Sequence, residues 1–311
     1  MTMDMSSVPP PFPEINSSVN SPKKKFISWE KQPMGWVTKS LLIVCCLLLF
    51  FVQIQSQKYP QSVKSLGLFS SPFERALLFD DPLFLQYLDE YLTLYGLDGL
   101  QEGTRVPSGA NQLIDKMENT PYWKGLYSLL VNDDWEEIKQ KVHETPMFEK
   151  IQQGEVWRFV SPCLLHADIF HLLFNMLWLL VLGKQIEQRL KAGRYLIFII
   201  LVGAFSNTIQ YLMTGPNFVG FSGVLCGMLA FIWVRQKNAP WEGYHLDRMT
   251  LIFMFVYILG MAGLQLITFL FEKTFQMDFS TNIANTAHLM GGIAGYFLGK
   301  FSFFSWRQEL S

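Results

Sequence analysis

The sequence has 311 residues, of which 50% are hydrophobic and only 16% are charged. This composition excludes an ordinary soluble enzyme of this length and indicates a membrane protein. The formal net charge of −1 and the lack of a long basic stripe give no reason to expect a nucleic acid partner. Three of the four cysteines lie within apolar runs, so no disulfide framework is predicted.

The first part of the chain is predicted to be a disordered cytoplasmic arm over residues 1–35, because it is rich in Pro, Ser and Asn and poor in apolar residues. An apolar run follows, and we predict a first transmembrane helix over residues 36–53. This run begins too far along the chain for an ordinary signal peptide and is followed by no small-residue cleavage site. Lysines before it place the N-terminus in the cytoplasm.

Residues 54–165 are predicted to form a helical extracytoplasmic segment. Ser71-Pro72-Phe73-Glu74 has the form of a capping box, and Asp81-Pro82 opens a second helix that should end at Gly96. Asn132-Asp133-Asp134 precedes a third helix. The apolar stripes of the last two predict packing against other helices or the span ends, with the lipid interface as the alternative. These stripes are Phe84, Leu88, Tyr91 and Tyr95 on one helix and Trp135, Ile138 and Val142 on the other.

Five further apolar runs predict transmembrane helices at about 169–190, 194–213, 219–234, 249–271 and 284–304. Basic residues gather between the second and third helices and between the fourth and fifth, while the other connections are not basic. The predicted fold class is therefore an all-α polytopic membrane protein with six spans, both termini cytoplasmic, a core over residues 166–304 and a cytoplasmic tail over 305–311. The chain shows no internal repeat.

A serine stands between glycines at the start of the fourth apolar run, in Gly220-Phe221-Ser222-Gly223. The run from Ser222 to Val234 covers roughly 20 Å at about 1.5 Å per residue, less than the hydrocarbon core of about 30 Å. The irregular stretch 214–217 must complete this span, so Ser222 should lie below the membrane surface at a helix N-terminus. Non-helical backbone at that depth needs protein or a water-filled cavity over it, and a broken span with a polar residue suggests a site.

Other polar residues are predicted at the same depth, because the second, fourth and sixth spans begin at the same face. His171 and Asn175 share one face of the second span, and His288 lies about one turn inside the sixth. Glycines recur every four residues in the fourth and sixth spans, so these helices can approach closely and bring Ser222 opposite His288. The glycines are Gly223 and Gly227 on one helix and Gly291, Gly295 and Gly299 on the other.

These residue types together suit nucleophilic catalysis. A serine hydroxyl becomes a nucleophile when a base removes its proton, and histidine is the commonest such base. We predict Ser222 as nucleophile and His288 as general base, with His171, Asn175 and the Ser222 amide as donors to an oxyanion. Each residue alone also has a structural explanation, as a hydrogen-bonded core histidine, an interhelical asparagine or a packing glycine.

Several other chemistries lack their residues. His166, beside Asp168 near the interface, is assigned a structural role, and no His-Glu-x-x-His is present for a metal. The sequence also has no P-loop, no dinucleotide fingerprint and no pair of intramembrane aspartates. We therefore predict neither a metal nor a cofactor, and neither ATP-driven transport nor aspartyl proteolysis.

The motifs together resemble those of rhomboid intramembrane serine proteases over about Gly154–Gly299. In order they are Gly154-Glu155-Val156-Trp157-Arg158, His171-x-x-x-Asn175, Gly183-x-x-x-Glu187, Gly220-x-Ser222-Gly223 and Ala287-His288-x-x-Gly291-x-x-x-Gly295. The resemblance implies a Ser222–His288 dyad without an acidic third member, an oxyanion site at His171 and Asn175, and structural roles for Trp157, Arg158 and Glu187.

The resemblance also implies substrates and a location. The substrates would be single-span membrane proteins cut near the outer edge of the transmembrane segment, often after a small residue. They would enter sideways past the fifth span, with residues 272–283 as a movable cap. The six-span form is typical of an integral protein of the bacterial inner membrane, in contact with the lipid bilayer. No oligomeric state is predicted.

Two departures from the family and two other functions stay open. Family members often carry an aromatic residue one turn after the nucleophile, where this chain has Cys226. The 54–165 segment is longer than the first loop of the minimal bacterial enzymes, and either gating or partner recognition would explain it. The other functions are a catalytically silent rhomboid-like protein that binds transmembrane helices, and a small transporter, for which the third and fifth spans offer little beyond Gln210 and Gln265.

Overall fold

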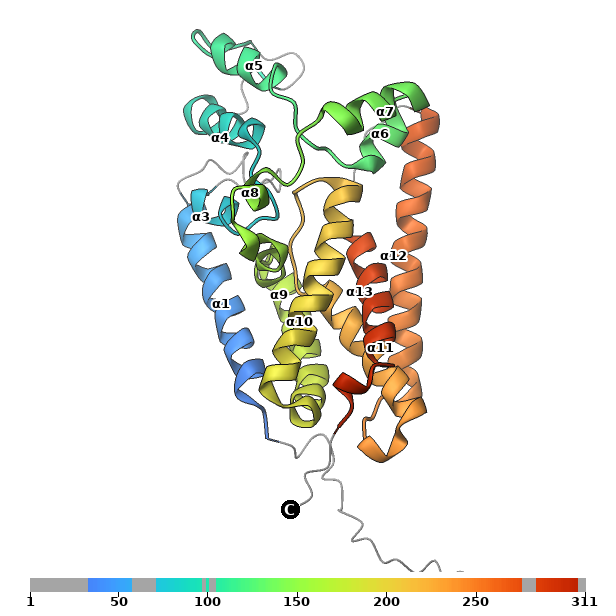
Figure 1. Cartoon of the computed structure of the whole chain (residues 1–311). Helices are drawn as coiled ribbons and strands as arrows, with labels where there is room; N and C mark the ends of the chain where they lie inside the picture. The colour runs from blue at the N-terminus through green and yellow to red at the C-terminus, as the bar shows by residue number, and fades with distance from the viewer. Residues whose placement is uncertain (1–32, 58–70, 97–98, 101–104, 276–283, 307–311) are drawn as a thin grey trace, which may run out of the picture.

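A computed structural model describes residues 33–57, 71–96, 99–100, 105–275 and 284–306. All regular secondary structure within these ranges is helical, in agreement with the predicted all-α class (Figure 1). Most of the predicted disordered arm, most of the predicted cap and residues 307–311 of the predicted tail lie outside the described residues.

Three helical stretches among the described residues are long and apolar enough to cross a membrane. They are α1 (Trp36–Ser56), the continuous stretch Ile169–Thr214, and Arg248–Thr274 within α12 (Arg248–Phe275). Figure 1 shows α1 and α12 on opposite sides of the bundle, with α10, α11 and α13 between them. The buried share of the most apolar window is 44% in Ile169–Thr214 but only 6% in α12, so α12 is the least enclosed of the three.

The stretch Ile169–Thr214 contains two of the predicted spans. It comprises α9 (Ile169–Trp178), a π-helical turn η4 (Leu179–Gly183) and α10 (Lys184–Thr214). The backbone leaves the helical conformation at Lys191, where φ is +62°, a value that a non-glycine residue rarely adopts. Tyr195 after this break packs against Gly183 before it, so the chain folds back between the predicted helices at 169–190 and 194–213.

The two helices that carry Ser222 and His288 are shorter, and their ends differ from the prediction. The helix at the predicted fourth span, α11 (Ser222–Asn238), begins at Ser222 but continues past Val234, because the side chain of Arg235 is buried and paired with Glu242. The helix at the predicted sixth span, α13 (Asn285–Leu298), ends at the Gly299 C-cap, before the short 3₁₀ helix η6 (Ser302–Phe304). The predicted helix over 284–304 is therefore wrong at its C-terminal end.

The helices within the predicted extracytoplasmic segment, which we call the outer segment (residues 54–165), gather at one end of the bundle (Figure 1). They are α3 (Pro72–Arg75), α4 (Leu83–Tyr95), α5 (Asn111–Glu118), α6 (Leu126–Asn132), α7 (Trp135–Glu144) and α8 (Glu149–Gln152). The 3₁₀ helices η2 (Val156–Phe159) and η3 (Ser161–Leu164) lead into α9, and η5 (Pro240–Glu242) lies between α11 and α12.

The sequence predicted three of these outer helices from their caps. The capping box at Ser71 is formed by both of its hydrogen bonds, α4 ends before Gly96, and Asp134 caps α7. The apolar stripe of α4 packs on α5 around the buried Tyr91, as expected. The α7 stripe does not: only Ile138 is buried, whereas Trp135 is 64% exposed. The prediction of packing is therefore wrong for most of the α7 stripe.

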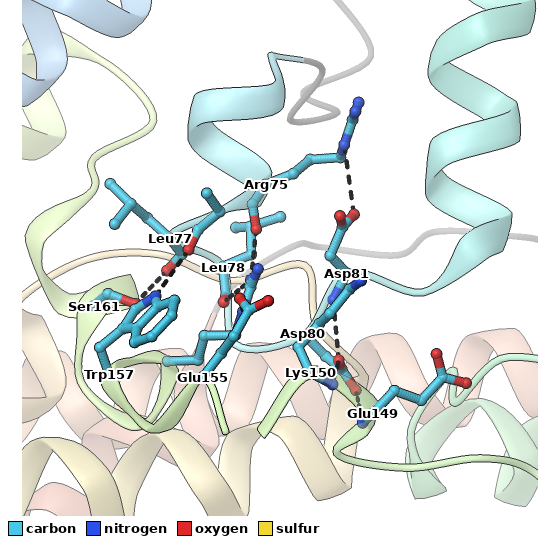
Figure 2. Close-up of polar contacts among 12 residues, drawn as sticks. Arg75, Leu77, Leu78, Asp80, Asp81, Glu149, Lys150, Glu155, Trp157 and Ser161 are labelled. Atoms are coloured by element: carbon cyan, nitrogen blue, oxygen red, sulfur yellow. Dashed lines mark hydrogen bonds and ion pairs between the residues drawn. The ribbon is translucent and has the colours of Figure 1, made fainter. Parts of the chain in front are cut away.

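Polar contacts fix the outer segment to the bundle (Figure 2). The Arg158 guanidinium donates to the carbonyls of Arg75 and Leu78 at 2.6 and 2.8 Å. The Ser161 hydroxyl donates to the Leu77 carbonyl at 2.7 Å, and the Asp80 carboxylate accepts from the backbone N–H groups that open α8. The chain around α3 is thereby held against η2, η3 and α8.

A buried carboxylate fixes α1 to α10. Glu187 accepts hydrogen bonds from the Val37 and Thr38 backbone N–H groups at 2.8 and 2.9 Å and from the Thr38 hydroxyl at 2.7 Å. Both N–H groups belong to the first turn of α1, which has no intrahelical acceptor for them, so the carboxylate serves as the cap of this helix.

Candidate active site

The closest polar contact between α11 and α13 joins the two residues predicted as a dyad. Ser222 is the first residue of α11, His288 lies in the first turn of α13, and the Ser222 Oγ is 2.7 Å from the His288 Nε2. Glycine makes this approach possible, because a Cβ added at Gly291 would collide with the Gly223 carbonyl. A neutral imidazole with its proton on Nδ1 would accept the hydroxyl proton at Nε2, the arrangement that a general base requires.

Ser222 and His288 open onto a cavity of about 260 Å³ between α9, α11, α12 and α13. His171 and Asn175 line the same cavity, so all four predicted site residues meet there. The remaining walls are mostly apolar, formed by residues such as Phe174, Trp178, Leu225, Met254, Tyr257 and Met261. A mostly apolar cavity with a few convergent polar groups is typical of a binding site.

The two α9 residues lie on the face that turns toward α11. The Asn175 side chain is buried, and its Nδ2 donates to the His171 backbone carbonyl at 2.9 Å, which leaves a second N–H on that nitrogen. The His171 ring lies against Gly220, where an added Cβ would be 2.8 Å from its Nε2. Gly220 also has a φ of +124°, which L residues rarely adopt. Both this backbone conformation and the close approach of the His171 ring therefore require glycine at position 220.

His166 borders the site more closely than the sequence indicated. Its ring is buried and meets the His171 ring edge-on at 5.2 Å. Burial, and then the neighbouring His171, lowers the pKa of His166 to about 4, so the ring is neutral at pH 7. Asp168 does not pair with His166 but caps α9, accepting from the Phe170 and His171 N–H groups at 2.8 and 2.9 Å.

Two residues near the Ser222–His288 contact were not assigned a role from the sequence. Gln210 of α10 is buried, and its Oε1 accepts a hydrogen bond from the Ala287 N–H at 2.8 Å, one residue before His288. Tyr257 of α12 places its ring 6.3 Å from the His288 ring, beside a cavity wall that contains Cys226. A polar residue inside an apolar run was the available signal for Gln210, and no comparable signal marked Tyr257.

The described part of the chain contains no group of three or more His, Cys, Asp or Glu residues able to hold a metal ion. The polar groups around the cavity are the hydroxyl, imidazole and amide groups already named.

The fold and site define a helical membrane protein with a serine–histidine pair in a recessed cavity. Residues 153–304 match the family model described as Rhomboid domain. Over 148 residues the chain is 32% identical to the rhomboid protease GlpG of Salmonella newport (strain SL254) and to that of Salmonella heidelberg (strain SL476). It is 30% identical to that of Salmonella paratyphi A (strain ATCC 9150 / SARB42).

Each match covers 48% of this chain and 49% of the relative, so the chain spans about half the length of the relatives it matches. Residues 153–304 of this chain therefore form a region of the rhomboid family.

Proposed function

We propose that this protein is an intramembrane serine endopeptidase that cleaves transmembrane segments of single-span membrane proteins with a Ser222–His288 dyad. The observation that carries the proposal is the 2.7 Å contact between the Ser222 Oγ and the His288 Nε2 inside a cavity lined by His171 and Asn175. Relatives named as rhomboid proteases support the same reaction class.

The geometry suits acyl transfer in two steps. The Ser222 Oγ attacks the scissile carbonyl carbon while the His288 Nε2 takes the hydroxyl proton, and the resulting oxyanion accepts hydrogen bonds from the Ser222 N–H, His171 and Asn175. His288 then gives its proton to the leaving amine. A water molecule, deprotonated by His288, attacks the acyl-enzyme, and the proton returns to Ser222 as the carboxylic acid product departs.

The proposed topology has six spans, with both termini in the cytoplasm of a bacterial inner membrane. At about 1.5 Å per residue, α11 and α13 extend roughly 26 and 21 Å, less than a hydrocarbon core of about 30 Å. Their N-terminal ends would lie below the outer surface, with Ser222 and His288 there. A substrate helix would reach them sideways, between α9 and α12.

The test uses the full chain in detergent, a single-span substrate with small residues near the outer end of its span, and the variants Ser222→Ala and His288→Ala. Each variant is expected to lose cleavage by at least about 10³-fold, because the two residues act as one unit. Ser56→Ala, which alters an exposed hydroxyl bonded to its own helix, is the matched control and should cleave normally.

Circular dichroism would verify that the variants fold, and a fluorophosphonate would report Ser222 reactivity directly. Cleavage that persists in Ser222→Ala would identify a different nucleophile. The wild-type protein could instead bind the substrate helix as tightly as both variants do, without cutting it or reacting with the probe. That result would indicate a catalytically silent helix-binding protein.

A further inference from the structure

The outer segment reaches the helix that closes the side of the cavity. On α12, the Glu272 carboxylate accepts a hydrogen bond from the Tyr127 hydroxyl of α6 at 2.8 Å. One residue further, the Lys273 Nζ donates to the Leu130 carbonyl in the last turn of α6 at 3.0 Å. The Tyr127 and Phe269 rings meet edge-on at 5.3 Å. We call these five residues, Tyr127, Leu130, Phe269, Glu272 and Lys273, the outer latch.

The burial of side chains along α12 shows where this helix is held against the rest of the bundle. Among its described side chains, Met254, Thr268 and Glu272 are the buried ones. Met254 lies in the half near η5, whereas Thr268 and Glu272 are one turn apart at the end beside α6. The stretch between them holds Tyr257 and Met261, which line the cavity. The described part of α12 is thus enclosed near its two ends, and α6 encloses the outer one.

The other side of α6 is attached to a part of the molecule that is firmly packed. The Trp123 Nε1 donates to the Tyr211 carbonyl near the end of α10 at 2.9 Å. A Cβ added at Gly125 would collide with the backbone of Met213 and Thr214, so the chain entering α6 touches the end of α10 directly. Leu126 and Leu129 pack on the apolar cluster around Phe79 and Tyr211. The helix α6 therefore bridges an enclosed helix, α10, and a weakly enclosed one, α12.

The side of the cavity toward α12 is closed by two aromatic contacts with α9. The Phe174 and Tyr257 rings lie 5.9 Å apart, and the Trp178 and Phe253 rings are stacked at 6.4 Å. A helix entering between α9 and α12 would have to separate both pairs and move α12 outward. Such a movement also pulls Glu272 and Lys273 away from α6.

We propose that the outer latch holds α12 against the bundle, so that its release limits entry of a transmembrane substrate to Ser222. This inference rests on the proposed function and gives the outer segment a regulatory role at that site. The Glu272 Oε1 is buried without a hydrogen-bond partner among the described residues, so the Tyr127 hydroxyl is the donor that compensates burial of this carboxyl group. Removal of that donor should favour the released position of α12.

The first experiment compares the double variant Tyr127→Phe/Lys273→Met with the matched control Tyr122→Phe/Lys139→Met. The control residues lie in the same outer segment, where Tyr122 stacks on Phe84 and Lys139 pairs with Glu136. The latch variant should cleave a single-span substrate about fivefold faster, the order expected from losing two modest hydrogen bonds. Fluorophosphonate labelling of Ser222 should be unchanged, because a small probe does not require α12 to move. Equal cleavage by the latch variant and its control would overturn the proposal.

The converse experiment closes the latch. Leu130→Cys and Lys273→Cys, in a Cys46→Ser background, would be joined by a cleavable bis-maleimide; the other three native cysteines are buried. Joined protein should lose cleavage of the single-span substrate by at least about tenfold, keep its labelling by the small probe, and recover when the linker is cut. Undiminished cleavage by joined protein contradicts the latch.

A distance measurement separates this inference from the proposed function. Spin labels at the exposed positions Leu173 of α9 and Leu270 of α12 report the position of α12 whether or not the protein cuts anything. A longer or broader distance distribution in Tyr127→Phe/Lys273→Met than in the control supports the latch, and identical distributions refute it. Failure of Ser222 to react with the probe refutes the protease function and leaves the distance result standing.

Discussion

At the scale of single residues, the proposed dyad depends on how the His288 ring is held. The Nδ1 of His288 has no hydrogen-bond partner among the described residues, so no side chain described here orients the imidazole from behind. Its position is set through the first turn of α13. Gln210 accepts from the Ala287 N–H, and the Asn285 Nδ2 donates to the Met261 carbonyl at 3.0 Å. Gln210 thus acts on the proposed base through the backbone that carries it.

The variant Gln210→Leu should therefore impair the reaction more than the fold. It leaves the buried Ala287 N–H without its acceptor, at a cost of about 1–3 kcal/mol, and frees the first turn of α13 to shift. We expect fluorophosphonate labelling of Ser222 to slow about tenfold, the equivalent of about 1.4 kcal/mol. Thr208→Val is the matched control, because the Thr208 hydroxyl donates to the Ala204 carbonyl of its own helix and, among the described residues, to no group of α13. Equal labelling of both variants by folded protein would contradict the positioning role.

The residues that line the candidate site were easier to predict from the sequence than the contacts that hold those residues in place. Ser222, His171, Asn175 and His288 stood out because polar groups are costly within apolar runs. Gln210 stood out for the same reason, but its partner is a backbone N–H 77 residues away, which no local pattern reveals. Tyr257 faces His288 because of how α12 is rotated in the bundle, and that rotation depends on tertiary packing.

At the scale of elements, the contact between α11 and α13 determines whether a site exists. Added Cβ atoms at Gly291 and Gly295 would collide with the carbonyls of Gly223 and Gly227, so the two helices touch backbone to backbone. Close packing of this kind takes the place of a hydrophobic driving force within lipid. The sequence predicted this pair from glycine spacing alone.

Two adjacent glycines of α13 provide a test with an internal control. Gly291→Ala should force α11 and α13 apart and destabilise the protein by about 1–3 kcal/mol or more, because the added methyl group meets backbone. Gly292→Ala adds the same methyl group where, apart from its own helix turn, no atom lies within 4 Å, and should be neutral or stabilising by up to about 1 kcal/mol. The unfolding temperature of each variant would be measured as the temperature at which the buried Cys163 and Cys226 begin to react with a thiol-reactive dye. Similar unfolding temperatures for the two variants would show that the helices are not in backbone contact.

Helix starts were predicted more accurately than helix ends. Ser71 and Asp134 mark starts because a side-chain acceptor next to the first turn is a local signal. The end of α11 depends instead on Arg235, a charge that normally terminates an apolar run but is neutralised here by Glu242 from beyond the helix. The break at Lys191 falls between the predicted helices at 169–190 and 194–213, but its positive φ of +62° belongs to a lysine, which no local pattern predicts.

At the scale of the whole molecule, the two ends of the bundle differ in composition and in structure. The helices α3–α8 cover one end, and the connection between α11 and α12 lies at the other (Figure 1). The basic residues of this second end also support the fold. Arg189 donates to the Glu242 and Gly243 carbonyls, and Arg194 donates to the Phe303 and Ser305 carbonyls. The same charges that predict a cytoplasmic face therefore tie its loops together.

The proposed orientation can be tested on intact bacterial cells that produce the full chain. In a Cys46→Ser background, a cysteine at the exposed Lys139 of α7 should react with a membrane-impermeant maleimide before lysis, because α7 belongs to the end proposed to be extracytoplasmic. A cysteine at Trp241, 65% exposed in the connection between α11 and α12, should react only after lysis. If Trp241→Cys were labelled in intact cells and Lys139→Cys were not, the orientation of the protein in the membrane would be the opposite of the one proposed. The Ser222 cavity would then open near the cytoplasmic face, and substrates would have to be cut at the opposite end of their spans.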